Sequence, residues 1–392
     1  MTLIRLAAVW MASLLLWGVL SLWIEGRWAW AILETGVFAT AGWRVLAGEL
    51  PALHLASIPL AAAVLWPLLQ LALGTTTYRA ATWSAALDWL AFFLVFVLSS
   101  DLFAERARKH AFLAAASLFG MMTAMVATIG AYACPGKVAC VVDTGFAGGV
   151  MGPFVNRNQY CAWVELLLPG ALYLAAVDTR WRAFFASAAA VMAGSVVASA
   201  SRAGSVLMGA EIMAVAVALA SRRMTRRRMA AGAAQFAVLA ALAISLAGWQ
   251  QLGNRWRTAG PDDLRQDALR ASLRMVRARA WMGTGLGTWS RIYPRYATID
   301  RGVFMNQAHN DWAQWAAEGG LPFVLLLLFF AALLWKAAFR SIYGIGLFVF
   351  LTHALVDYPM QQRPALAAWL FCIAGVSCAC VRGGAQSHDG LL

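Results

Sequence analysis

The chain has 392 residues, of which 62% are hydrophobic and only 12% are charged, and its mean hydropathy is +0.67. Because soluble domains average about 25% charged residues, this composition excludes a soluble globular protein and indicates a polytopic membrane protein. A net charge of +13 would suggest nucleic-acid binding in a soluble protein, but no nucleic-acid motif accompanies it, and basic residues are expected in the cytoplasmic loops of membrane proteins.

Apolar runs recur along the whole chain and set its expected architecture. A helix that crosses a bilayer needs about 20 mostly apolar residues. Twelve runs meet this test, at 3–24, 28–47, 52–74, 80–100, 110–133, 159–177, 181–200, 204–221, 229–249, 320–339, 341–356 and 364–381. We therefore expect an all-α polytopic membrane protein with about twelve transmembrane helices.

The charges of the connections predict its orientation. Basic residues gather at 101–110 and 221–229 and near Arg180 and Lys336, and the positive-inside rule assigns such connections to the cytoplasm. With twelve spans and a cytoplasmic N-terminus, four polar segments fall outside, at 134–159, 201–204, 250–320 and 357–363. The expected organisation is then nine transmembrane helices, a large outer loop, and three further transmembrane helices with a short cytoplasmic tail, in residues 1–249, 250–320 and 321–392.

The six cysteines fall into two groups. Four lie in or beside apolar runs, where cysteine is typically a small buried hydrophobic residue: Cys161, Cys372, Cys378 and Cys380. Cys134 and Cys140 flank a short Pro-Gly-Lys loop, and they would form a disulfide if that loop faces an oxidising compartment. The sequence leaves both states of this pair open.

The 250–320 loop contains ten arginines, no lysine and six acidic residues. Pro261-Asp262-Asp263 is typical of a helix start, because the helix dipole favours acidic residues in the first turn, and we expect this helix to run to about Ala280. Its apolar stripe consists of Leu264, Ala268, Ala271 and Met275. Its basic face consists of Arg270, Arg274 and Arg277. Such an amphipathic helix is expected along the membrane surface or over a cavity.

Two further elements follow in this loop. The glycine-rich segment 283–287 fits neither the dinucleotide-binding spacing nor the P-loop, so it predicts a turn with close backbone packing. A second short helix is expected at His309–Glu318, stopped by Gly319-Gly320. On this helix His309 would share a face with Trp312.

His309 is the main candidate for chemistry, because it is the only histidine in the long loop and histidine changes charge near neutral pH. It could act as a general base, a metal ligand or a polar helix cap. No second histidine or carboxylate pair stands at ligand spacing, so we expect neither a metal nor another cofactor.

The arginines and asparagines form the second candidate set. Guanidinium groups suit bidentate contact with phosphate, although the basic face of the loop helix would equally contact anionic lipid headgroups. Arg202 lies in a tight turn between two apolar spans, where a charge is costly unless it is paired or functional. Asn156, Arg157 and Asn158 stand at the outer mouth of the sixth span. They would bind sugar hydroxyls or cap the helix that follows. The polar residues of the loop 357–363 are open to the same two interpretations, substrate binding or a structural role.

The order and spacing of several motifs over residues 150–325 carry a resemblance to a known family. The motifs are Phe154-Val155-Asn156-Arg157-Asn158-Gln159 before Leu166-Leu167-Leu168-Pro169, Ser201-Arg202-Ala203-Gly204, Gly283-Thr284-Gly285-Leu286-Gly287-Thr288-Trp289, Tyr293-Pro294-Arg295-Tyr296, and His309-Asn310-Asp311-Trp312 with Glu318-Gly319. Together they resemble the O-antigen ligase and O-antigen polymerase superfamily of bacterial lipid-linked glycan transferases.

The resemblance implies a GT-C-like membrane fold and a metal-independent, inverting glycosyltransferase that uses no nucleotide sugar. The enzyme would work at the periplasmic face of the bacterial inner membrane, so the large outer loop would be periplasmic. Its donor would be a glycan on undecaprenyl diphosphate, and its acceptor lipid A-core or another lipid-linked glycan. Membrane lipids are the other expected partners, and nucleic acid is not one.

Motif matching also implies residue roles. His309 would be the base near the acceptor hydroxyl, and Arg202 and Arg265 would contact the diphosphate. The family pattern has a tryptophan four residues after the second arginine, where this chain has Leu269, so Arg270 is the alternative to Arg265. The residues expected to bind substrate are Asn156, Arg157, Asn158, Tyr293, Asn310 and Asp311.

Alternative functions remain open at this level. A polymerase of the same superfamily, which joins repeat units into O-antigen, capsule or exopolysaccharide, would differ from a ligase only in its acceptor. A transporter or flippase for lipid-linked glycans is less favoured, because transporters show internal repeats and midplane charges. This chain shows no repeat and concentrates its polar residues in one loop. A protein O-glycosyltransferase would share parts of the same signature.

Overall fold

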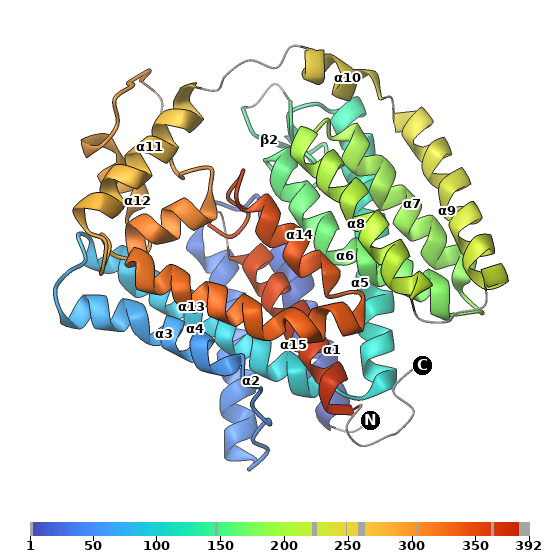
Figure 1. Ribbon diagram of the computed structural model, residues 1–392, viewed down its shortest axis with the longest axis horizontal. Coiled ribbons are helices and arrows are strands. Elements are labelled where there is room, and N and C mark those ends of the chain that lie inside the picture. Colours follow the sequence, from blue (N-terminus) through green and yellow to red (C-terminus); the bar gives the residue numbers. More distant parts are fainter. Residues whose placement is uncertain are drawn as a thin grey trace.

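The computed structural model describes residues 3–145, 148–221, 226–247, 249–257, 263–302, 304–361 and 364–383. Nearly every element is a helix, as the sequence predicts (Figure 1). In chain order these are α1 (Leu3–Leu20), α2 (Arg27–Leu46), α3 (Ser57–Ala72), α4 (Arg79–Leu102), α5 (Arg106–Ala133), α6 (Arg157–Val177), α7 (Arg182–Ala198), α8 (Arg202–Ala220), α9 (Arg226–Ala247), α10 (Gln250–Arg257), α11 (Asp263–Ala278), α12 (Trp289–Ile292), the 3-10 helix η1 (Tyr293–Arg295), α13 (Asp311–Ser341), α14 (Ile345–His353) and α15 (Ala365–Gly383). Two short antiparallel strands, β1 (Lys137–Val138) and β2 (Val142–Asp143), complete the described part.

The apolar runs predicted from the sequence all contain a helix. Within the described residues, six helices are long and apolar enough to cross a membrane, namely α1, α4, α5, α6, α8 and α13. Several long apolar helices make this a multi-pass membrane protein, while the count of twelve spans stays a prediction. The expected span at 341–356 fits least well, because α14 has only 9 residues. At about 1.5 Å per residue it is roughly 14 Å long, about half the thickness of a bilayer core.

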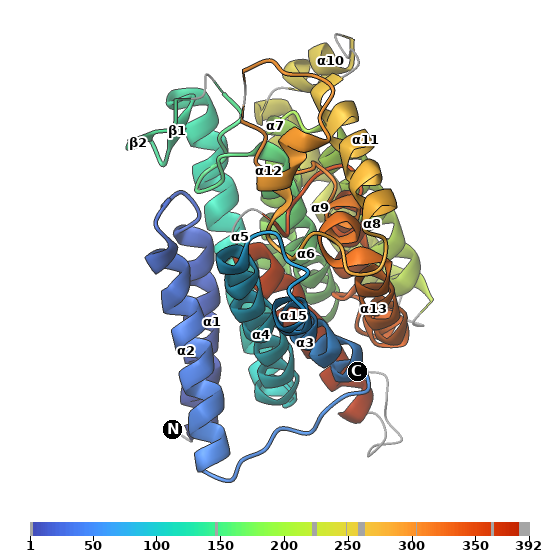
Figure 2. The same ribbon diagram turned by 90° about the vertical axis from the view of Figure 1, so that its left-hand side faces the viewer.

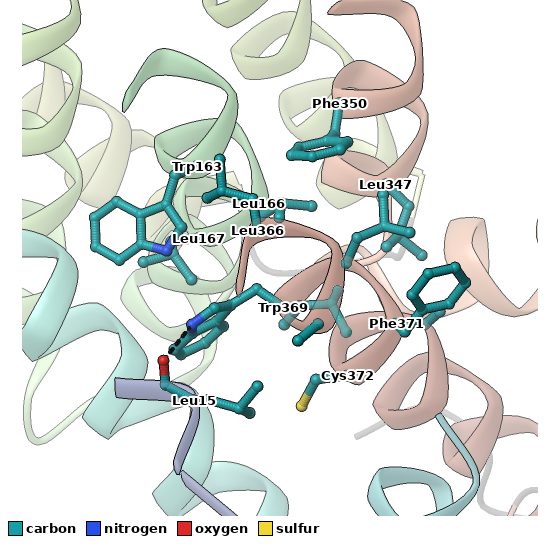
Figure 3. Close-up of a cluster of buried hydrophobic side chains, with 14 of the residues drawn as sticks. Leu15, Trp163, Leu166, Leu167, Leu347, Phe350, Leu366, Trp369, Phe371 and Cys372 are labelled. Atoms are coloured by element: carbon teal, nitrogen blue, oxygen red, sulfur yellow. Dashed lines mark hydrogen bonds between the residues drawn. The ribbon is translucent and has the colours of Figure 1, made fainter. Parts of the chain in front are cut away.

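The centre of the bundle is formed by α15, which packs against α1, α4, α6, α13 and α14. Its Trp369 is 1% exposed, and the indole nitrogen donates to the carbonyl of Leu15 at 3.0 Å (Figure 3). Trp163, Phe350 and Phe371 fill the space around it. Because the helix is apolar on every side, it is expected in the middle of a bundle rather than at its rim.

One end of the bundle carries the polar elements. The β1–β2 hairpin, α10 and α12 lie at this end, and the start of α1 lies at the other (Figure 1 and Figure 2). Cys134 and Cys140 are joined by a disulfide beside the hairpin. The polar segment 250–320 and the loop between α5 and α6 therefore lie at the same end of the bundle.

The predicted amphipathic helix is confirmed as α11, although Pro261 and Asp262 lie outside the described residues. Ala268, Ala271 and Met275 are fully buried, and they pack with Trp289 of α12 in a small core of their own. Arg270 and Arg277 are exposed. The 3.6-residue period thus separates the two faces as predicted.

The second predicted helix of the loop is present but starts and ends differently. It begins at Asp311, where Asn310 caps it through a 2.9 Å bond from the backbone N–H of Ala313. The helix kinks at Gly320, which has a φ of 77° and a ψ of 174°, and continues to Ser341. The expected stop is therefore a kink. His309 precedes the helix with a φ of 53°, so the prediction that it shares a helical face with Trp312 is wrong.

The glycine-rich segment 283–287 is the tight, closely packed turn that its composition predicts. The side-chain amide of Gln70 donates to the carbonyls of Met282 and Glu318 at 2.6 and 2.8 Å. The carboxylate of Glu318 in turn accepts from the backbone N–H groups of Gly287 and Trp289 at 2.9 and 2.8 Å. These bonds fix the segment between α3 and α13, and thereby fix the position of α11.

Replacing Gly283 with alanine is expected to destabilise the protein strongly. Gly283 has a φ of 63°, and an added Cβ would lie 2.2 Å from the carbonyl oxygen of Glu318. Gly74 is a matched control, because its φ is 67° but nothing lies within 4 Å of an added Cβ. Gly74→Ala should cost only the backbone strain, about 1–2 kcal/mol. The melting temperature in detergent should fall clearly further for Gly283→Ala, and equal falls would contradict the steric explanation.

Candidate functional site

His309 faces a buried carboxylate. Its Nδ1 lies 3.7 Å from Oδ1 of Asp357, and the two side chains are 18% and 1% exposed. This is an ion-pair distance rather than a hydrogen bond, and in an enzyme without substrate such contacts are often long. The ring of Tyr358 meets the imidazole edge-on, with 4.6 Å between the ring centroids. His309 is thus held between one charged and one aromatic neighbour.

Electrostatics favour the ionised form of Asp357. Burial alone raises the pKa of its carboxyl group, but the interaction with His309 and the positive charge of Arg265 outweigh burial, so the pKa is lowered overall. Burial, followed by the charge of Asp357, raises the pKa of Tyr358 to about 12. Near neutral pH the site therefore presents a carboxylate and a neutral phenol beside the imidazole.

The asparagine cluster before α6 joins this site to α8. The side-chain amide nitrogen of Asn158 donates to Oδ2 of Asp357, across 199 residues of sequence. Its amide oxygen accepts from the hydroxyl of Ser201 at 2.8 Å. Asn156 caps α6 by accepting from the N–H of Asn158 at 2.8 Å, and it also contacts Tyr358. The capping interpretation is confirmed for Asn156, while Asn158 positions Asp357. Binding of sugar hydroxyls by this cluster stays a prediction.

Several arginines approach this site from separate elements. Arg202 is the first residue of α8, and its guanidinium lies over the ring of Trp256 at 5.9 Å. Arg255 of α10 donates to the carbonyl of Ala200 at 3.4 Å, which docks α10 on the turn before α8. Burial lowers the pKa of Arg255, and the positive charges of Arg202 and Arg265 lower it further. Like charges this close repel one another, and a bound anion would relieve the repulsion.

Helix N-termini add to the positive potential. α6, α8 and α13 begin next to the residues above, at the caps Asn156, Ser201 and Asn310. The N-terminus of a helix carries the positive end of its dipole and free N–H groups, and it favours anions. The arginines and the helix ends therefore suit a negatively charged ligand.

The structure separates the two alternative arginines of α11. Arg265 acts electrostatically on Asp357, Tyr358 and Arg255. Arg270 is exposed, and it lies five residues later, which is about 140° further around the helix.

Arg157 is close enough to Arg255 for the two charges to repel each other, and it donates to the carbonyl of Ser199 at 3.3 Å. Arg157, Arg202, Arg255 and Arg265 form what we call the arginine cluster.

Three of the expected substrate-binding residues are occupied in holding the fold. Tyr293 stacks on Trp289 with 4.7 Å between centroids, and its hydroxyl donates to Asp267 at 3.0 Å. Asp311 is buried and accepts from the N–H of Met360 at 3.0 Å. The side chain of Asn310 caps α13 and donates to the carbonyl of Leu355 at 2.7 Å. Asp311 and Asn310 thus tie the loop after α14 to the start of α13.

The sequence left Asp357 open between sugar binding and a structural role, and it did not select Tyr358 or Arg255 as site residues. Asp357 and Tyr358 belong to a short polar loop near the C-terminus, and Arg255 is one of ten arginines in the long loop. A charge beside an apolar span was the only sequence signal that could have indicated these residues.

Among the described residues, no group of three histidine, cysteine, aspartate or glutamate side chains is arranged to hold a metal ion. Metal independence stays a prediction.

Comparison with protein families gives one match. Residues 187–330 match the family described as O-antigen ligase. The matched region contains Arg202, Arg255, Arg265 and His309, whereas the asparagine cluster and Asp357 lie outside it. No curated protein matches the chain at a significant level. The family match confirms the resemblance noted in the sequence, because residues 187–330 are similar to the O-antigen ligase family, whose members are glycosyltransferase-like enzymes.

Proposed function

We propose that this protein transfers a glycan from undecaprenyl diphosphate to an acceptor hydroxyl at the periplasmic face of the inner membrane, as an O-antigen ligase. The observation that carries the proposal is the convergence of the arginine cluster and three helix N-termini on the His309–Asp357 pair. The cationic groups suit a diphosphate, and the imidazole beside them suits removal of a hydroxyl proton.

The proposed reaction is a single displacement. The acceptor hydroxyl gives its proton to His309, and the oxygen attacks the anomeric carbon of the donor glycan. The bond from that carbon to the diphosphate oxygen breaks, its electron pair stays on undecaprenyl diphosphate, and the configuration inverts. Arg202 and Arg265 bind the developing negative charge. Asp357 faces the Nδ1 side of His309 and stabilises the imidazolium that forms.

The disulfide supports the proposed orientation. Disulfides form in oxidising compartments such as the periplasm and are rare in the cytoplasm. Cys134 and Cys140 are bonded, and their loop lies at the end of the bundle that also carries α10 and α12 (Figure 2). A periplasmic disulfide would bring the His309 site to the periplasmic side as well.

A labelling experiment tests the orientation. In a Cys134→Ser variant, Cys140 is left as a free thiol, and a membrane-impermeant maleimide should label it in intact spheroplasts. Ala104→Cys is the matched control, because Ala104 is exposed at the other end of α5, a helix of 28 residues. It should be labelled only after lysis. The reverse pattern would place the site on the cytoplasmic side.

A transfer assay tests the function itself. Purified protein would be incubated with undecaprenyl diphosphate-linked glycan and, in separate reactions, with lipid A-core or a second lipid-linked glycan. Transfer to lipid A-core supports a ligase, and extension of the lipid-linked glycan identifies a polymerase. The assay runs in detergent, where no membrane separates two compartments, so turnover also rules out a pure transporter. The absence of product with either acceptor would contradict the proposal. Adding EDTA to the reaction would test whether transfer is independent of metal ions.

A further inference from the structure

A cavity of about 520 Å³ lies between α4 and α13, beside the glycine-rich segment and α12. None of the residues assigned above to the diphosphate or to proton transfer lines it. Its volume falls in the range of about 300–1,000 Å³ that is typical of small-ligand sites. The proposed reaction needs room for two glycan-bearing substrates, and this cavity is large enough to hold part of one of them.

The charges that line the cavity differ from those of the arginine cluster. Asp88 and Glu318 contribute two carboxyl groups, and Arg291 is the one cation among the described lining residues. The guanidinium of Arg291 already lies 4.0 Å from the ring centroid of Tyr78. Asp88 is paired with Arg27 at 3.7 Å, and the cavity sets one cation against two carboxyl groups, so it lacks the excess of positive charge that a diphosphate needs.

The remaining lining residues suit a polyhydroxylated ligand. Gln307 and Ser290 offer hydrogen-bond donors and acceptors, which can be matched to hydroxyl groups. Trp89 and Trp315 supply aromatic surface for the apolar faces of a sugar ring. Aromatic walls with a few convergent polar groups are the usual composition of a small-molecule site.

The cavity is connected to the proposed reaction centre by two loops. Gln307 lines the cavity and precedes His309 in the same loop, and Gln361 lines it in the loop that carries Asp357. The side chain of Gln314 holds the first loop by accepting from the N–H of Ala308 at 2.9 Å and donating to Gln307 at 2.6 Å. A ligand bound to Gln307 would therefore lie next to the loop that carries the base.

We propose that this cavity binds a saccharide unit of a substrate, separately from the diphosphate site formed by the arginine cluster. The inference rests on the proposed function for the identity of the substrates. It adds the division of the site into a cationic part for the diphosphate and an acidic, aromatic part for the sugar. The saccharide could belong to the donor or to the acceptor, and the experiment below distinguishes these sources.

Thiol protection tests the proposal without depending on turnover. Ser84 of α4 lines the cavity and is half-buried, so Ser84→Cys should react with a small maleimide. Undecaprenyl diphosphate-linked glycan and the acceptor glycolipid would be tested one at a time, with undecaprenyl diphosphate alone as the sugar-free probe. A bound saccharide at ten times its Kd should slow labelling about tenfold. Protection by the glycan-bearing donor alone assigns the cavity to the donor, and protection by the glycolipid alone assigns it to the acceptor.

Leu87→Cys is the matched control. Leu87 lies on the same helix, is 40% exposed and does not line the cavity, so no ligand should slow its labelling. The unsubstituted chain gives the background, since Cys161, Cys372 and Cys378 are buried. The proposal is overturned if neither glycan-bearing ligand protects Ser84→Cys, or if undecaprenyl diphosphate alone protects it equally well.

A steric variant gives a second readout. Ser84→Trp should raise KM for the substrate whose sugar enters the cavity by about 10-fold or more, as expected for a blocked pocket, while Leu87→Trp should leave KM unchanged. Transfer by the unsubstituted chain with no effect of Ser84→Trp would overturn the cavity proposal and leave the proposed function intact. Saccharide protection without any transfer would overturn the proposed function and leave the cavity proposal intact.

Discussion

Replacing His309 with alanine is expected to lower the rate of glycan transfer by about 10²–10⁴-fold, the usual contribution of a general base. The imidazole is the group placed to take the proton of the acceptor hydroxyl. Its Nδ1 side faces the carboxylate of Asp357. The measurement is kcat for transfer between lipid-linked glycan and acceptor, in protein that elutes as a single species in detergent.

His110→Ala is the matched control for this substitution. His110 contacts Asp178 with 3.0 Å between Nε2 and Oδ2, so both variants remove a histidine that faces an aspartate. The His110 variant should keep its transfer rate within about twofold, as surface substitutions usually do. Asp357→Asn should reduce the rate and also alter its pH profile, because Asp357 acts through His309. A fully active His309→Ala enzyme would eliminate His309 as the base.

Removing Arg265 is expected to weaken the use of the lipid-linked donor by about 10²–10³-fold in kcat/KM, as for other groups that bind transition-state charge. Arg265 acts on Asp357 and on Arg255, so its guanidinium lies in the arginine cluster. Arg202→Ala should have an effect of the same order. Lysine at either position should restore only part of the activity, because an ammonium group cannot make the bidentate contact.

Arg270→Ala is the matched control for Arg265→Ala. It removes the same charge from the same helix, but at an exposed position on another face. We expect no more than about a twofold change in kcat/KM and a small loss of affinity for anionic lipid vesicles. Binding of undecaprenyl diphosphate alone should fall for Arg265→Ala and not for Arg270→Ala. The opposite result would move the diphosphate contact to Arg270.

The sequence predicted the local elements of the long loop well, because their signals are local. The apolar stripe of Ala268, Ala271 and Met275 is buried as its period requires. The glycine-rich segment forms the expected tight turn. The predicted start of the second helix was two residues too early, because Asn310 caps α13 and the helix begins at Asp311 rather than at His309. Helix ends depend on which polar side chain reaches the free N–H groups, and several candidates stood side by side.

The sequence could not identify the partners of the site residues. Asp357 becomes a site residue because α14 and the loop after it return to the start of α13, where its backbone carbonyl accepts from Asp311 at 3.3 Å. Tyr293, which the resemblance assigned to substrate binding, is buried against Trp289 and Asp267, and its role in substrate binding stays a prediction. Both outcomes depend on contacts between segments far apart in the chain, which hydrophobic period and motif spacing do not encode.

By itself the sequence determined the membrane class, the helical elements and the resemblance to the O-antigen ligase family, and it made His309 the main candidate for chemistry. Composition, apolar period and motif order are properties of short stretches of chain. Only the tertiary structure showed that Arg265 rather than Arg270 joins the arginine cluster, because the two differ in the face of α11 on which they lie. Only the tertiary structure revealed the acidic, aromatic cavity, whose walls come from α4, α13 and the loops around α12. A cavity is the space that packing leaves between distant elements, so no single stretch of sequence specifies it.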